Sequence, residues 1–244
     1  MRLDGTGQTL EQIGASLVGA GHLNLRIWPE NQRMQELGDP RILGTQFPDI
    51  SLFHDSAIAL VTRAAADLAP NIRGYGGRKV RDAATWGSPE LTLLNWRALY
   101  LFCATRGVQS AHVVDRWINF MEHDDYSSAH CHFESDAAIV YSLDPGDPNP
   151  QRPASGRLEI IDSRIPICCP RRPERPTRKI APEMLPGTMI VFPAEFIHLV
   201  NPYDGFRPRI TVAWNISAGT PPPDLPDLTQ QGTVIVTTED GKFL

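Results

Sequence analysis

Apolar side chains recur at helical spacing in three stretches of the first half of the chain, which predicts three helices. The stretches are Thr9–Val18, Ser56–Leu68 and Pro89–Thr105. The third has the clearest ends, because Ser88 suits an N-cap, proline suits the first helical position, and Gly107 can end the helix in a left-handed conformation. Its apolar residues cover more faces than a surface helix needs, so we expect it to pack against a sheet.

After Gly107 the hydrophobic pattern changes to the alternation that is typical of strands. Prolines gather in two connections, Asp144–Pro153 and Pro166–Pro176, and a last β-prone run, Thr233–Thr237, fits an edge strand or a flexible arm. Helices first and strands later predict an α+β fold, a β-sandwich or barrel braced by helices on one face. The expected strands are Ala111–Met121, Ala137–Leu143, Arg157–Ile161, Thr188–Phe192 and Arg209–Ile216.

The length and composition fit one large domain. The chain has 244 residues, of which 41% are hydrophobic and 21% charged, as in soluble globular proteins. We interpret residues 1–244 as a single domain. Residues 1–110 are expected to be mainly helical support, residues 111–217 the β core, and residues 218–244 a C-terminal extension.

Charge and hydropathy argue against two classes of partner. The net charge of −5 disfavours a nucleic-acid surface. No apolar run approaches the roughly 20 residues that span a bilayer, and Met1–Thr9 lacks the pattern of a signal peptide, so we expect a cytoplasmic protein without a membrane partner. The basic stretch Arg171–Lys179 is interpreted as a solvated loop, with a lid or an acidic-partner site as the alternative.

The histidines suggest a metal site. His130 and His132 are two residues apart, so in a strand both would project to one face and could share an ion. His198 follows an apolar strand and could supply a third ligand. Two ligand sets remain open: His130, His132 and His198, or the two-histidine, one-carboxylate set of His132, Glu134 and His198, which is common in iron(II) oxygenases. An ordinary polar role for an isolated His-x-His pair is the simplest alternative.

Arg209 begins an apolar strand whose alternation places Arg209, Thr211 and Asn215 on one face. A buried guanidinium requires a partner, and its planar fork matches a carboxylate. Arg209 could therefore bind an organic acid, with Thr211 as a further donor, or it could form a structural ion pair with an internal carboxylate. Arg207 is a competing arginine, but it precedes Pro208 and is expected in the loop.

Together these segments resemble the 2-oxoglutarate- and Fe(II)-dependent oxygenases, in particular a bacterial and phage branch related to prolyl hydroxylases. The resemblance extends from about Trp117 to Asn215, with a weaker match upstream. The matching segments, in order, are Trp117-Ile-Asn119, Tyr126, His130-Cys-His132, Tyr141-Ser-Leu143, Gly156–Asp162, Pro186-Gly187, Phe192-Pro193, His198-Leu-Val200 and Arg209-Ile-Thr211 through Asn215.

The resemblance implies a double-stranded β-helix, that is a jelly-roll or cupin-like barrel, with Fe(II) near its mouth and 2-oxoglutarate and O2 as co-substrates. The branch typically carries His-x-His where prolyl hydroxylases carry His-x-Asp, so His130, His132 and His198 are the implied ligands and Glu134 is the alternative. This sequence departs from the branch at Phe133, where a proline is common, and at Ala138-Ile139, where a Ser-Gly pair is common.

The resemblance further implies that Arg209 and Thr211 bind 2-oxoglutarate and that Tyr126 and Asn215 line the cavity, although Tyr126 also fits a core aromatic. The expected activity is hydroxylation of a small-molecule, amino-acid or peptide substrate. Three rivals remain: a three-histidine cupin-type dioxygenase that does not use 2-oxoglutarate, a non-catalytic jelly-roll binding protein, and, less favoured, a zinc hydrolase.

Overall fold

The computed structural model describes residues 25–29, 31–69, 77–161, 179–221 and 234–235. The predicted helix Thr9–Val18 and most of the basic stretch Arg171–Lys179 lie outside these residues. In chain order the elements are β1 Gln35–Glu36, β2 Leu43–Gln46, the 3-10 helix η1 Ile50–Leu52, α2 His54–Ala66, β3 Arg78–Val80, α3 Ala83–Trp86, α4 Pro89–Arg106, β4 Ser110–Met121, β5 Ser127–His130, β6 Ala137–Asp144, β7 Leu158–Ile161, β8 Lys179–Ile180, β9 Thr188–Pro193, β10 Ile197–Val200, β11 Arg209–Ala218 and β12 Val234–Ile235.

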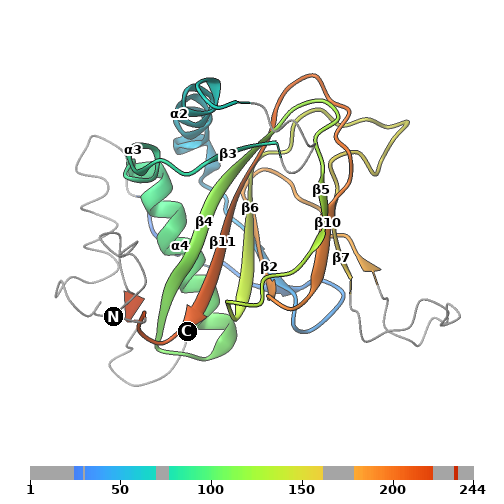
Figure 1. Cartoon of the computed structure of the whole chain (residues 1–244). Coiled ribbons are helices and arrows are strands. Elements are labelled where there is room, and N and C mark those ends of the chain that lie inside the picture. Colours follow the sequence, from blue (N-terminus) through green and yellow to red (C-terminus); the bar gives the residue numbers. More distant parts are fainter. Residues whose placement is uncertain (1–24, 30, 70–76, 162–178, 222–233, 236–244) are drawn as a thin grey trace, which may run out of the picture.

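Two antiparallel sheets face each other, as expected for a double-stranded β-helix. The larger sheet has the order β1-β2-β9-β6-β11-β4, with β3 and β12 both paired to β4. The smaller sheet has the order β5-β10-β7-β8. Figure 1 shows α2, α3 and α4 on the outer face of the larger sheet and the smaller sheet on its other side. Within the described residues, hydrogen bonding does not close the two sheets into a continuous barrel.

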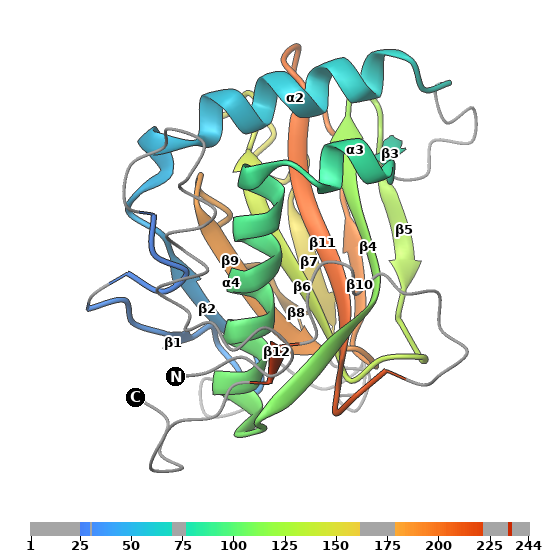
Figure 2. The same ribbon diagram turned by 90° about the vertical axis from the view of Figure 1, so that its left-hand side faces the viewer.

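The prediction for the third helix is confirmed. The Ser88 hydroxyl accepts a hydrogen bond from the Leu91 amide at 3.3 Å, Pro89 begins the helix, and Gly107 ends it with φ at +64°. Helix α4 is buried on most of its surface and crosses the larger sheet (Figure 2). Even Arg97 is fully buried, where it pairs with Asp49. This burial explains why the apolar residues of α4 cover so many faces.

The five predicted strands are all present, with ends within two residues of the expected bounds. The C-terminal run also forms a strand, because β12 pairs with β4. The expectation that residues 1–110 are mainly helical support stays a prediction. Among the described residues of this part, short strands accompany the helices: β2 extends the larger sheet beside β9, and β3 adds a strand beside β4. These strands have two to four residues, too few for an alternating pattern to be recognised.

No helix in the described part of the chain combines the length and the apolar character needed to cross a bilayer. The main hydrophobic core lies between the larger sheet and the helices, and a second cluster fills part of the space between the sheets. The helices thus support one face of the larger sheet and leave its inner face to form the site. That inner face carries alternate residues of β4 and β11.

Candidate metal centre

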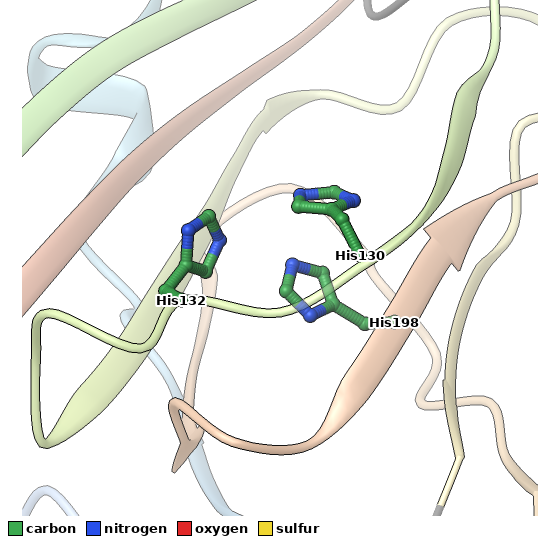
Figure 3. Close-up of side chains that lie close together, drawn as sticks. All are labelled: His130, His132 and His198. Atoms are coloured by element: carbon green, nitrogen blue, oxygen red, sulfur yellow. The ribbon is translucent and has the colours of Figure 1, made fainter.

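Three histidines meet between the two sheets. One ring nitrogen from each of His130, His132 and His198 lies within 4.8 Å of the others, and no other group of this kind occurs among the described residues. The ring centroids are 5.0 Å apart for His130 and His132, 4.3 Å for His130 and His198, and 5.0 Å for His132 and His198. Figure 3 shows the three rings pointing toward a common space. The spacing suits ligands around one ion.

Backbone pairing brings these residues together. His130 is the last residue of β5 and lies directly opposite His198 on the neighbouring β10. His132 lies beyond the end of β5, so strand alternation, the reason given for expecting His130 and His132 on one side, does not apply to it. Its position is set by its backbone amide, which donates a 2.8 Å hydrogen bond to the Ala194 carbonyl.

Each histidine uses its Nδ1 atom for a contact within the protein. The His130 Nδ1 lies 2.7 Å from the Ser128 carbonyl oxygen, and the His198 Nδ1 lies 3.0 Å from the Phe196 carbonyl oxygen. A carbonyl only accepts, so both Nδ1 atoms carry the proton and both Nε2 lone pairs are free for a metal. This is the arrangement that holds metal-ligating histidines in a fixed tautomer and orientation.

Burial keeps two of the imidazoles neutral. Desolvation, helped by the neighbouring His130, lowers the pKa of His132 to about 4 and that of His198 to about 3. Neutral imidazole is the form that binds metals. Aromatic neighbours hold the rings: Trp117 lies 5.7 Å from the His132 centroid, and Phe192 lies 5.0 Å from that of His198.

Other candidate residues lie away from this group. Glu134 is exposed and is not among the three clustered residues, so the geometry gives no support to the ligand set that includes it. His112 is buried and contacts the Gly219 carbonyl at 3.1 Å. His123 is largely exposed and stacks against Phe206. Three imidazoles and no carboxylate therefore form the cluster.

Arg209 is buried, with only 4% of its surface exposed. Its Nη1 atom donates to the Met121 sulfur at 3.4 Å, and no described carboxylate forms an ion pair with it. Burial lowers its pKa from 12.5 to about 10. Within the described chain, the structural ion pair considered as an alternative is absent. Arg207, in contrast, is exposed and pairs with Asp144 and Asp147.

A close loop fixes the arginine side chain. A Cβ atom at Gly156 would lie 3.0 Å from the Arg209 Cδ atom and 2.9 Å from the Tyr203 ring, and Gly156 has φ at +60°. Both features favour glycine, because any side chain here would press on Arg209. The loop before β7 thus limits the conformations open to the guanidinium.

The remaining predicted residues extend this face. Thr211 is buried and accepts a 3.3 Å hydrogen bond from the Asn119 side chain. The Asn215 Nδ2 atom lies 3.2 Å from the His132 Nδ1 atom, while the buried Asn215 Oδ1 has no partner. Rotating the amide by 180° would let Oδ1 accept from a protonated Nδ1. Tyr126 is half-buried just before β5, and its role in the cavity stays a prediction.

Sequence reasoning missed the charged residues of β3. Lys79 lies opposite Asn119, which in turn lies opposite Thr211, so all three share the inner face. The available signal was the placement of Lys79 and Arg81 two residues apart, which in a strand puts both on one face. This stretch is too short for a strand to be distinguished from a loop on the sequence pattern alone.

A comparison with known families supports this chemistry. Residues 115–215 match the family described as "Putative 2OG-Fe(II) oxygenase". This part of the chain is similar to the 2OG-Fe(II) oxygenases. The match covers β4 to β11 and includes all three histidines and Arg209. The expectation of an oxidoreductase that uses Fe(II) and 2-oxoglutarate is thereby confirmed at the level of the family.

Several solved structures share the fold. EctD from S. alaskensis is 14% identical, with a TM-score of 0.54, and the alignment covers 86% of this chain and 97% of EctD. The epimerase SnoN from nogalamycin biosynthesis is 14% identical, with a TM-score of 0.53 and coverage of 82% and 89%. A prolyl hydroxylase from Trichoplax adhaerens is 12% identical, with a TM-score of 0.51 and coverage of 73% and 84%. At these identities the likeness supports the double-stranded β-helix. A search of curated protein sequences finds no match.

Proposed function

We propose that this protein is a 2OG-Fe(II) oxygenase that hydroxylates a small-molecule, amino-acid or peptide substrate, with His130, His132 and His198 as ligands of the iron. The observation that carries the proposal is the convergence of three imidazoles whose Nδ1 atoms are already engaged. Neutral nitrogen donors suit a divalent transition metal. The described cluster would supply three ligands and would leave other positions on the metal open for 2-oxoglutarate and O2.

Arg209 is proposed to bind the far carboxylate of 2-oxoglutarate. It begins β11, on the face that also carries Thr211 and Asn215. A guanidinium that is buried without a described acidic partner gains most from a carboxylate, which can accept two parallel hydrogen bonds. Thr211 lies two residues further along this face and is placed to donate one more through its hydroxyl.

Iron and 2-oxoglutarate supply the oxidising power when bound, with succinate and CO2 as the products of the keto acid. The chain positions the reactants. Ser128 and Phe196 hold two histidine rings through their carbonyls, Trp117 and Phe192 pack beside the rings, and Arg209 fixes the far end of the keto acid. Buried apolar neighbours also limit the entry of water.

The printed descriptions of the fold neighbours give context for the cofactors and the range of substrates. SnoN has been crystallised with Fe3+, alpha ketoglutarate and nogalamycin RO, and the Trichoplax enzyme with a peptide fragment of hypoxia inducible factor. The one ligand is a natural product and the other a peptide. Both classes are therefore retained in the proposal for this chain.

Formation of succinate tests the proposal. The purified protein, loaded with Fe(II), is expected to convert 2-oxoglutarate slowly to succinate under O2 even without its substrate, and His198→Ala is expected to abolish this conversion. Glu134→Gln serves as the matched control and should retain it. Absence of both 2-oxoglutarate binding and succinate would favour the three-histidine dioxygenase, in which Arg209 binds a carboxylate of the substrate. A protein purified without oxygen that binds no metal would favour a non-catalytic module.

A further inference from the structure

The inner face of the larger sheet carries a second charged group beside the histidines. On β4, Trp117 lies opposite Ala213 and Asp115 opposite Asn215, so both share the face that carries Arg209. Lys79 joins this face from β3 through its pairing with Asn119. The face looks toward the metal centre, because the Trp117 ring contacts the His132 ring.

Two cations gather around the Trp117 ring. The Lys79 Nζ atom lies 5.2 Å from the ring centroid, and the Arg81 Cζ atom lies 5.3 Å from it. Both distances are within the range of cation–π contacts. The same indole contacts the His132 ring, so these cations lie beside the candidate metal centre.

The charges of this group do not balance. Arg81 is paired with Asp115 through two contacts, the second of them 3.2 Å between Nη2 and Oδ2. Lys79 forms no ion pair with any described carboxylate. Lys79 is exposed, so its ammonium is open to a ligand that enters from solvent. Desolvation and the like charge of Arg81 lower its pKa, while Asp115 raises it, and a second cation this close makes an anion the favoured partner.

The metal centre adds no negative charge of its own. A two-histidine, one-carboxylate set would place an anionic ligand close to this group, whereas three neutral imidazoles do not. The two charges of 2-oxoglutarate would offset those of Fe(II), and Asp115 is already neutralised by Arg81. Among the described residues that contact Trp117 or pair with them, Lys79 therefore carries the one charge that is not offset, which favours an anionic ligand.

We infer that Lys79 binds a carboxylate of the substrate, and that the substrate is a small organic acid held between Lys79 and the proposed iron. The inference rests on the proposed function, since it uses the position of the iron. The Trp117 ring positions the Lys79 side chain through the cation–π contact, and Arg81 adds to the attraction of an anion. The substrate carboxylate would thus bind at Lys79, whereas Arg209 would bind the co-substrate 2-oxoglutarate.

Pairs of acids and amides provide the test. Protein loaded with Fe(II) and 2-oxoglutarate under nitrogen is titrated with phenylacetate and hexanoate, each beside its primary amide, and binding is followed by ligand-observed NMR. Wild-type protein is expected to bind the acids about tenfold more tightly than the amides, as one charge-assisted contact allows. Lys79→Met should remove this preference and Lys79→Arg should keep it. Lys179→Met changes a lysine that pairs with Glu159 and is the matched control.

The absorbance change on binding of 2-oxoglutarate to the Fe(II) protein separates the two proposals. If the wild-type protein shows no such change, the proposed function fails. If 2-oxoglutarate binds but acids have no advantage over amides, or if Lys79→Met keeps the advantage, the inference about Lys79 is overturned alone. A Lys79→Met protein that binds 2-oxoglutarate more weakly would place Lys79 in the co-substrate site and would also overturn it. Lys79→Arg provides a folded reference should Lys79→Met be unstable.

Discussion

Replacing Arg209 with methionine should make the protein more stable and yet unable to hold 2-oxoglutarate. The guanidinium is buried, and its pKa falls from 12.5 to about 10. That difference means that the folded protein disfavours the charged form by about 3 kcal/mol. Methionine is of similar length, carries no charge and lies beside Met121. We therefore expect the free energy of unfolding of the ligand-free protein to rise by about 1–3 kcal/mol in Arg209→Met.

The same change should weaken binding of 2-oxoglutarate strongly. Removing one partner of a buried charge pair costs about 2–5 kcal/mol. At about 1.4 kcal/mol for each factor of ten, the dissociation constant should rise by about 30-fold to several thousand-fold. The assay is thermal unfolding with Mn(II) and increasing 2-oxoglutarate, which should stabilise the wild-type protein and leave Arg209→Met unchanged.

Arg207→Met is the control for this experiment, because Arg207 is exposed and forms its ion pairs on the surface. It should bind 2-oxoglutarate as the wild type does. An Arg209→Met protein that is less stable than the wild type and still responds to 2-oxoglutarate would refute the reasoning. It would mean that the guanidinium has a structural partner.

Three further predictions concern the metal centre and the buried histidines. His198→Ala should abolish binding of one equivalent of Fe(II) or Mn(II) measured by calorimetry, whereas Glu134→Gln should keep it, and the reverse result would restore the carboxylate set. Asn215→Ala should lower metal affinity by about 10- to 100-fold by releasing the His132 ring, and an unchanged affinity in the same assay would exclude that role. Burial lowers the pKa of His54 to about 4, so its neutral form stabilises the fold fully above about pH 6.5, and this contribution is lost as the pH falls toward 4. In urea unfolding of the metal-free protein, His54→Gln should reduce the pH dependence in this range by about 1 kcal/mol per pH unit, and an equal slope would contradict the argument.

The long elements could be predicted from the sequence because each carries a local signal, and the candidate ligand residues could be named from it. Helix α4 has its cap at Ser88 and its end at Gly107, and β11 alternates from Arg209 onward. The three histidines could be named from spacing and resemblance. Their convergence could not be derived from strand alternation, because β5 ends at His130 and a backbone contact to Ala194 places His132.

The charged group beside Trp117 shows the limit of sequence reasoning. Lys79 belongs to a strand of three residues, and its neighbours Trp117 and Asn119 are about 40 residues away along the chain. Only the pairing of β3 with β4 brings them together, and short edge strands give no periodic signal that predicts their partner. Residues on such strands can be recognised as candidate site residues only when the register of strand pairing is known.

A crystal structure of the protein grown without oxygen, with Fe(II) and 2-oxoglutarate, tests the central claim most directly. The account predicts one iron bound by one nitrogen from each of His130, His132 and His198, with the keto acid reaching from the metal to the Arg209 guanidinium. Iron bound elsewhere, iron bound through Glu134, or a keto acid whose far carboxylate points away from Arg209 would contradict it.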